Sequence, residues 1–223
     1  MRLGAEGSSD AALVITRVER RKGGAKRYDI YINDEYAFSA HEDILVRHRL
    51  LKGAVLSEET FERAKREEWL HGAYLSAIRY LGRAMRSEKE VAKKLKSQGF
   101  DEETVAATIR RLTAEKLIDD GEYAAALARQ RLQSNKKGKL WIMRELADKG
   151  VDRGRIEAAL GQFDADAEFE TAWGLAVRRW QRDGGEREAK LRRLAGFLER
   201  RGFAQGTIRA VLRKLGELPE DNP

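Results

Sequence analysis

The sequence predicts a mainly α-helical protein, in which three tandem three-helix repeats of helix-turn-helix type form an elongated, curved body. A small N-terminal unit with a β-hairpin and helices is expected to precede them. Three observations support this prediction. Both prolines of the 223-residue chain lie among its last five residues, so almost nothing interrupts a helix. Alternating apolar and polar residues occur only in about the first 70 residues. A segment of 23 residues then recurs three times without gaps.

The N-terminal unit is expected to contain a small sheet. Residues 1–12 are small and polar, and we expect them to be loose. Residues 14–19 and 28–32 alternate in polarity, and Gly23-Gly24 lies between them, which is typical of a β-hairpin. A third strand is expected at residues 36–39.

Two helices are expected to follow these strands. Ser39 and Glu42 have the spacing of a capping box for a short helix that ends at Arg47. Ser57 can cap a second helix that runs towards Trp69. The first 70 residues therefore form a small mixed unit.

The repeat is the most informative feature after residue 71. Its copies are EVAKKLKSQGFDEETVAATIRRL at residues 90–112, WIMRELADKGVDRGRIEAALGQF at 141–163 and RLAGFLERRGFAQGTIRAVLRKL at 193–215. Apolar residues at i and i+4 before a shared glycine, and at i, i+4 and i+7 after it, each mark one face of a helix. Each copy therefore predicts a helix, a sharp turn and a second helix.

The turn glycines Gly99, Gly150 and Gly202 fall in one column of this alignment. Just past a helix end a left-handed backbone is favoured, and glycine adopts it without a steric clash. The next residue is expected to pack on a leucine of the first helix: Phe100 on Leu95, Val151 on Leu146 and Phe203 on Leu198. Asp101 and Asp152 are expected to cap the following helix, whereas Ala204 breaks that pattern.

Another helical stretch precedes each copy, at residues 74–84, 123–132 and 169–180, and we expect an aspartate of Asp119-Asp120 to cap the second of these. Three helices can enclose a minimal core, which two cannot. The predicted domains are a flexible N-terminus (1–12), a β/α extension (13–70), three repeats (71–118, 119–163 and 164–216) and a flexible tail (217–223).

The charge of the chain favours an acidic or polyanionic partner. Its net charge is +7, and residues 129–155 carry nine Lys/Arg against three Asp/Glu, while residues 176–215 carry twelve against four. Solvated helix faces can produce such blocks as well. The absence of cysteine excludes disulfides and thiol chemistry. With no apolar run of about 18 residues and no signal-peptide pattern, we expect a cytoplasmic protein.

No set of residues suggests catalysis. The chain has neither a nucleophile-elbow motif nor a phosphate-binding loop. His41 and His48 lie about 10.5 Å apart along a helix, too far to share a metal ion, although a nearby carboxylate such as Asp43 could assist one of them. The sequence therefore predicts a protein that is not an enzyme and has no cofactor and no metal.

Binding has better support, because the same corner of each repeat is basic. The candidate contacts are Arg83 and Arg86 in the first repeat, Arg129, Arg131, Lys136, Lys137, Lys139 and Arg144 in the second, and Arg178, Arg179 and Arg182 in the third. Trp141 could stack on a base or pack inside the repeat.

Four strings occur in order along the chain: YLSAIRYLGRAMRSEKEVAKKLKSQGF (74–100), KLIDDGEYA (116–124), RELADKGV (144–151) and FLERRGF (197–203). With these strings the sequence resembles the RecX family, bacterial modulators of the RecA recombinase. Residues 15–45 are similar to the extension carried by members from Gram-positive bacteria. The resemblance covers about residues 14–215.

The resemblance implies a non-enzymatic regulator that binds RecA filaments on single-stranded DNA along their helical groove. It implies inhibition of strand exchange, ATP hydrolysis and coprotease activity, and thereby modulation of DNA repair and the SOS response. Single-stranded DNA is an implied partner of this expected monomer, with double-stranded DNA a further candidate. The alternative is a DNA-binding protein whose tandem helix-turn-helix modules act on nucleic acid alone.

The family motif maps onto two arginines, Arg83 and Arg86, which lack an evident structural reason in the sequence. The other positions of the motif have a role in capping or packing, and Leu198 and Gly202 are the corresponding positions in the third repeat. These structural positions are Ser87, Glu90, Leu95, Gly99, Asp119, Asp120, Leu146, Gly150, Leu198 and Gly202.

Overall fold

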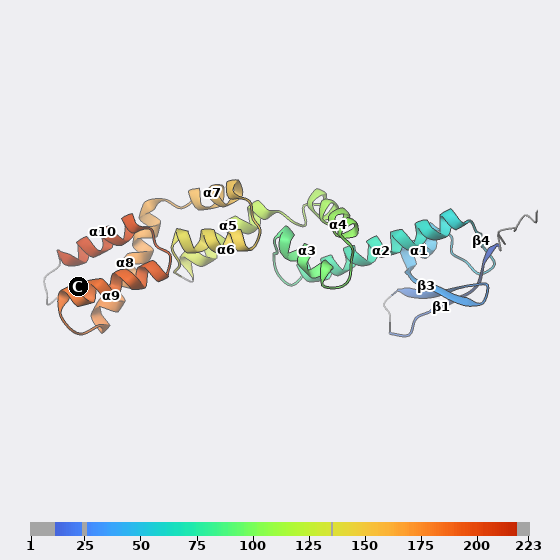
Figure 1. The fold of residues 1–223 in the computed structure, drawn as a ribbon, viewed down its shortest axis with the longest axis horizontal. Coiled ribbons are helices and arrows are strands. Elements are labelled where there is room, and N and C mark those ends of the chain that lie inside the picture. Colours follow the sequence, from blue (N-terminus) through green and yellow to red (C-terminus); the bar gives the residue numbers. More distant parts are fainter. Residues whose placement is uncertain (1–11, 24–25, 135, 218–223) are drawn as a thin grey trace, which may run out of the picture. The chain divides into compact units, whose positions relative to one another are not determined.

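The computed structural model describes residues 12–23, 26–134 and 136–217 (Figure 1). The chain divides into two compact units: the first comprises Met1–Ser76 and Phe100–Thr108, and the second comprises Ala77–Gly99 and Ile109–Pro223. The predicted flexible ends, 1–12 and 217–223, lie almost wholly outside the described residues, and so does Gly24 of the first hairpin.

The first unit contains an antiparallel sheet whose strand order is β3-β2-β1-β4. Its strands are β1 (Leu13–Arg20), β2 (Arg27–Ile32), β3 (Glu35–His41) and β4 (Val55–Leu56). The predicted hairpin and third strand are confirmed, and Asn33 and Asp34, both with positive φ, form the tight turn between β2 and β3. Strand β4 was not predicted, because two residues are too few to show a polarity pattern.

Helices α1 (Glu42–Arg47) and α2 (Glu58–Leu81) follow the strands. The predicted capping box at Ser39 is wrong: Ser39 pairs within β3, and the N-cap of α1 is His41, whose Nδ1 accepts a hydrogen bond from the Asp43 backbone N–H. Ser57 caps α2 as predicted, accepting from the Thr60 N–H. Helix α2 then continues past Trp69, so the boundary expected after residue 70 falls inside one continuous helix.

The apolar core of the first unit is formed by residues from the sheet, from α1, from the loop after α1 and from α2. These are Ile15, Ile30, Ile32, Ala40, Ile44, Leu50, Leu56 and Ala64. A register shift between Ile15 and Arg17 changes the alternation of β1, so that Val18 packs on the same core as Ile15.

The remaining helices form the three predicted repeats, here called modules. They are α3 (Glu88–Lys96) and α4 (Glu102–Ala114) after the end of α2, then α5 (Asp120–Gln133), α6 (Lys139–Asp148) and α7 (Arg153–Gly161), then α8 (Ala165–Arg182), α9 (Arg187–Arg200) and α10 (Gln205–Gly216). The second and third modules each have an apolar core of their own. Trp173 and Trp180 of α8 are half-buried and pack against the core of the third module.

The predicted turn conformation is confirmed in all three copies, while the packing of Phe100 on Leu95 stays a prediction. Gly99, Gly150 and Gly202 have φ of 91°, 86° and 80°. In the second and third modules the residue after the glycine donates its N–H to the carbonyl of the predicted leucine, Val151 to Leu146 and Phe203 to Leu198, which is the Schellman bond. Asp101 and Asp152 cap α4 and α7, and Ala204 provides no side-chain cap for α10.

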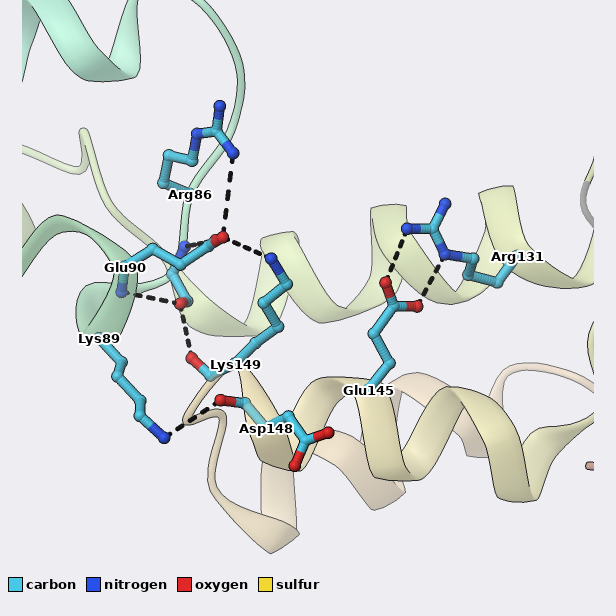
Figure 2. Close-up of polar contacts among 8 residues, drawn as sticks. Arg86, Lys89, Glu90, Arg131, Glu145, Asp148 and Lys149 are labelled. Atoms are coloured by element: carbon cyan, nitrogen blue, oxygen red, sulfur yellow. Dashed lines mark hydrogen bonds and ion pairs between the residues drawn. The ribbon is translucent and has the colours of Figure 1, made fainter. Parts of the chain in front are cut away.

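Two junctions in the second unit hold consecutive modules together. At the first junction, the start of α3 meets the end of α6 and the start of α5 (Figure 2). The Ser87 hydroxyl donates to the Lys149 carbonyl at 2.7 Å, and the Glu88 N–H donates to the Asp120 carboxylate at 2.9 Å. Glu90 pairs with the Lys149 ammonium at 2.5 Å. Ser87 and Glu90, both expected to have structural roles, form a capping box at the start of α3 that also serves this contact.

At the second junction, the start of α6 meets the end of α9 and α8. The backbones approach directly: the Gly138 N–H donates to the Arg201 carbonyl at 2.9 Å, and the Leu140 N–H to the Gly202 carbonyl at 3.0 Å. The Lys139 N–H donates to the Glu168 carboxylate at 2.9 Å. Each junction thus joins a helix start to the next module's Schellman turn and to a buried acid.

Candidate interaction surface

The basic residues predicted from the sequence divide into anchored and exposed groups. Three half-buried arginines are anchored, because each lies over an aromatic ring and beside a carboxylate. Arg86 lies over Tyr80 and 3.9 Å from Glu90, Arg131 over Trp141 and on Glu145, and Arg179 over Phe197 and 3.2 Å from Asp183. Arg86 therefore has a structural role that the sequence did not reveal.

Arg131 is the most strongly anchored of the three. Its Nε and Nη2 atoms donate to the two carboxylate oxygens of Glu145, both at 2.7 Å (Figure 2). This bidentate geometry fixes α5 to α6, and the hydrogen bonds to Glu145 raise the pKa of Arg131. Because its guanidinium is bonded to Glu145 within the module, we interpret Arg131 as a structural residue beneath the surface and not as a contact to a partner.

Five arginines are exposed, and within the described residues their side chains make no hydrogen bond or ion pair. They are Arg83, Arg129, Arg144, Arg178 and Arg182. Arg178 and Arg182 are four residues apart on α8 and so share one face of the helix. Every module thus has at least one cation available to a partner.

The lysines before α6 have mixed roles. Lys137 lies with its ammonium 4.4 Å from the centre of the Trp141 ring, and Trp141 packs half-buried on the core of the second module. Lys139 is structural, since its ammonium donates to the Phe163 carbonyl and its N–H to Glu168. Lys136 accepts at its carbonyl from Arg201 at 3.2 Å, which leaves its side chain available.

Three buried acids have roles that reasoning from the sequence did not find. Glu68, Asp120 and Glu168 are 8%, 3% and 4% exposed. Each accepts a backbone N–H at the start of a helix in the preceding part of the chain: His41, Glu88 and Lys139. Asp119 caps α5 as predicted, but Asp120 does not share that role. No local pattern marks these acids, because each partner amide is 27 to 32 residues away.

Burial has a measurable consequence at Asp120. Desolvation raises the pKa of its carboxyl group, while the hydrogen bond from Glu88 acts in the opposite direction. At the neighbouring Glu90, desolvation also acts to raise the pKa, but hydrogen bonds from Lys149 and from the Ser87 backbone prevail and lower it. The pKa values of two carboxyls at one junction are therefore shifted in opposite directions.

Potential metal ligands converge at one place in the described part of the chain. Ligand atoms of His41, Asp43 and His71, all in the first unit, lie within 4.8 Å of one another. Analysis of the sequence compared His41 only with His48, whose imidazole instead lies 3.0 Å from Glu67.

None of the described helices is both long and apolar enough to cross a bilayer.

Comparisons with known proteins agree with this architecture. Family models match as the RecX N-terminal domain at residues 13–57 and as the first, second and third three-helix domains of RecX at 73–112, 119–160 and 166–212.

Curated relatives and solved structures extend the comparison over most of the chain. The regulatory protein RecX of Oceanobacillus iheyensis is 33% identical over 90% of this chain and 76% of its own length. That of Clostridioides difficile is 31% identical over 91% of this chain and 95% of its own. A crystal structure of regulatory protein RecX matches with a TM-score of 0.72, at 31% identity, over 90% of this chain and 98% of its own. A RecX structure from Lactobacillus salivarius has a TM-score of 0.63, at 26% identity, over 68% of this chain and 99% of its own.

Proposed function

The chain belongs to the RecX family of regulatory proteins, and from this premise we propose that it is a non-enzymatic regulator of the RecA recombinase. It binds the RecA filament on single-stranded DNA along the helical groove. Bound there, it inhibits strand exchange, ATP hydrolysis and coprotease activity, and so modulates DNA repair and the SOS response.

The observation that carries the proposal is the separation of anchored from exposed cations. Every module holds one arginine against an aromatic ring and an acid, and leaves another exposed without an ion pair among the described residues. Because the junctions join the modules in the second unit by backbone and side-chain hydrogen bonds, the exposed cations of that unit keep a defined spacing. Repeated weak contacts at fixed spacing add up on a polymeric target, which is how a regulator of filaments gains affinity.

The test measures RecA-catalysed ATP hydrolysis on single-stranded DNA with increasing amounts of the protein. A triple variant, Arg129→Glu, Arg144→Glu and Arg178→Glu, is expected to need about tenfold more protein or more for half-inhibition. The matched control is Arg21→Glu, Lys22→Glu and Lys52→Glu, three exposed positions of the first unit that give the same change in net charge. Equal losses in both variants would contradict the proposed surface.

The same experiment separates the alternative function. Inhibition well below the amount of protein that coats the DNA supports a target on the filament. A DNA-binding protein that acts on nucleic acid alone would be supported instead by two results together: inhibition only when the protein coats the DNA, and binding to the same DNA when RecA is absent. In either case binding is expected to weaken steeply with salt.

The variant Lys136→Glu, Lys137→Glu and Lys139→Glu is less suitable for this test. Lys139 donates to the Phe163 carbonyl at the second junction, so a loss of binding would mix lost contacts with a disturbed module. Lys136→Glu alone is the cleaner probe of that loop.

A further inference from the structure

We infer that His41, Asp43 and His71 form a binding site for one divalent transition-metal ion, with Zn²⁺ the best match. All three residues belong to the first unit. The inference uses only the geometry of that unit and stands independently of the proposed function.

Three different elements supply the ligands. His41 is the last residue of β3, Asp43 is the second residue of α1, and His71 lies in the second half of α2 (Figure 1 shows these elements). The Asp43 Oδ2 atom is 3.3 Å from His41 Nδ1 and 3.7 Å from His71 Nε2. The two imidazole rings lie side by side, with centroids 4.7 Å apart. The three ligand atoms therefore enclose a common point.

The spacing of these atoms suits a transition metal. With all three atoms within 4.8 Å of one another, a point equidistant from them lies at most about 2.4 Å from each, and Zn²⁺ binds nitrogen and carboxylate oxygen at about 2.0–2.2 Å. Side-chain shifts of a few tenths of an ångström complete the site.

The electrostatics of the cluster also favour a cation. His41 Nδ1 accepts a long hydrogen bond, 3.3 Å, from the Asp43 N–H, so its single lone pair is engaged by that N–H, while the Asp43 Oδ2 atom lies 3.3 Å from the same nitrogen. Two acceptor atoms at such a distance repel each other unless a positive charge lies between them. A bound metal ion supplies that charge and replaces the long hydrogen bond.

The exposure of the ligands indicates an open coordination position. The side chains of His41 and His71 are 12% and 16% exposed, whereas that of Asp43 is 54% exposed. The protein thus shields two ligands and leaves the carboxylate side to solvent, where a water molecule can complete a tetrahedron. Two nitrogens and one oxygen suit Zn²⁺ and its neighbours in the transition series, whereas Mg²⁺ and Ca²⁺ prefer oxygen alone.

The site would connect the sheet to the long helix. His41 ends β3 and His71 belongs to α2, so a metal ion adds a bond between elements that otherwise meet through the core and through Glu68, which accepts the His41 N–H at 2.7 Å. Metal binding is therefore expected to stabilise the first unit against unfolding.

The test uses the full chain without an affinity tag that contains histidine. Zn²⁺ titration calorimetry is expected to give one ion per chain, and Co²⁺ is expected to give the visible absorption bands of a low-coordinate site. Asp43→Ala is the main variant, because Asp43 is exposed and its loss is expected to leave the fold intact, as checked by circular dichroism. Its Zn²⁺ dissociation constant is expected to rise by about 100-fold.

Glu42→Ala is the matched control. Glu42 is an acid in the same turn of α1, but its carboxylate pairs with Lys26 and not with the histidines. Its affinity for Zn²⁺ is expected to stay within about twofold of the parent chain. A second pair compares His71→Ala with His48→Ala, which removes an imidazole outside the cluster. The inference is overturned if no stoichiometric Zn²⁺ binds, or if Glu42→Ala weakens binding as much as Asp43→Ala does.

Discussion

At both junctions of the second unit, the start of a helix contacts the Schellman turn and a buried acid of the next module. The contact with the turn is made by a side chain at one junction and by the backbone at the other. At the first junction a side chain spans the gap: the Ser87 hydroxyl reaches the Lys149 carbonyl. At the second, Gly138 occupies the position of Ser87 in the repeat, and its own N–H reaches the Arg201 carbonyl. The buried acids Asp120 and Glu168 accept the next amide in both. A repeat can therefore conserve the geometry of a junction while exchanging a side-chain contact for a backbone contact.

This difference changes what each junction tolerates. A Cβ added to Gly138 would lie 2.3 Å from the Gly202 carbonyl oxygen and 2.3 Å from the Phe203 nitrogen, both backbone atoms. Gly138 has φ −80° and ψ 164°, which any residue adopts. The glycine is therefore required for space alone, and the second junction is the closer and less adaptable of the two.

The largest expected effect is that of Gly138→Ala. The clash forces α6 and α9 apart or strains their backbones, and we expect a loss of about 3 kcal/mol in the free energy of unfolding. Fluorescence of Trp141, which adjoins Gly202, would report the loss in a urea titration. The control is Gly174→Ala on α8, where a Cβ meets nothing within 4 Å and is expected to stabilise by about 0.5–1 kcal/mol. Similar behaviour of both variants would show that the backbones do not approach this closely.

The turn glycines sharpen the comparison. Alanine at Gly150 or Gly202 pays the left-handed strain of about 1–2 kcal/mol, and each new Cβ also meets the preceding module. Gly150 faces the Lys89 side chain, whose Cδ can move although its Cβ, at 2.6 Å, is fixed by the α3 backbone, whereas Gly202 faces the Trp141 backbone itself, with its nitrogen at 2.4 Å. We therefore expect Gly202→Ala to cost about 1 kcal/mol more than Gly150→Ala.

Gly99→Ala provides the baseline for that pair, because Gly99 has φ 91° but open space around it. Urea unfolding of the three variants would give the order Gly202, Gly150, Gly99 from largest to smallest loss. The reverse order of the two junction glycines would contradict a tighter second junction.

Ser87→Ala tests the side-chain contact of the first junction. It removes a helix cap and leaves the Lys149 carbonyl without its donor, so we expect a loss of about 1.5–2 kcal/mol. Ser57→Ala removes a cap from the exposed start of α2, with an expected loss of about 1 kcal/mol. The difference between the two, measured by chemical denaturation, isolates the bond between modules. If the two serines cost the same, the Ser87 hydroxyl contributes only its cap.

The sequence predicts the parts of this architecture that depend on local interactions. The turn at Gly150, the cap at Asp152 and the buried Leu146 follow from residues within one helical turn of each other, so their spacing alone predicts them. Ser39 shows the limit of such reasoning, because its spacing to Glu42 suits a cap but pairing of β3 with β2 takes precedence.

The remaining features depend on partners distant in the sequence. Gly138 lies among the basic candidates Lys137 and Lys139, and no local pattern marks its role, since the Gly202 backbone that it meets is 64 residues further along the chain. Asp120 was a candidate cap, because the Glu88 N–H that it accepts is 32 residues away and cannot be inferred from the local sequence. The candidate surface was likewise only partly predictable. Its basic composition is evident in the sequence, but whether an arginine is anchored depends on rings and acids such as Trp141 and Glu145, which only the fold brings together.

The smallest expected effect concerns the acids of the first junction and depends on pH. The lowered pKa of Glu90 means that its contribution is present above the ordinary pKa of a glutamate, about 4.3, and is lost as the pH falls through the folded-state value. The raised pKa of Asp120 has the opposite sign: its favourable contribution is complete below about pH 3.9 and is lost as the pH rises through the folded-state value.

Amide substitutions separate these two contributions. At pH 7 we expect Glu90→Gln to lose about 1 kcal/mol, because it gives up the charged bond to Lys149. Asp120→Asn keeps an acceptor for the Glu88 N–H and removes a buried charge, so its stability is expected to equal or exceed that of the parent chain. Urea midpoints measured from pH 7 to pH 3.5 should show both differences shrinking with acidification. A loss in Asp120→Asn at pH 7 as large as that in Glu90→Gln would mean that the ionised Asp120 stabilises the junction, and the two acids would then act alike.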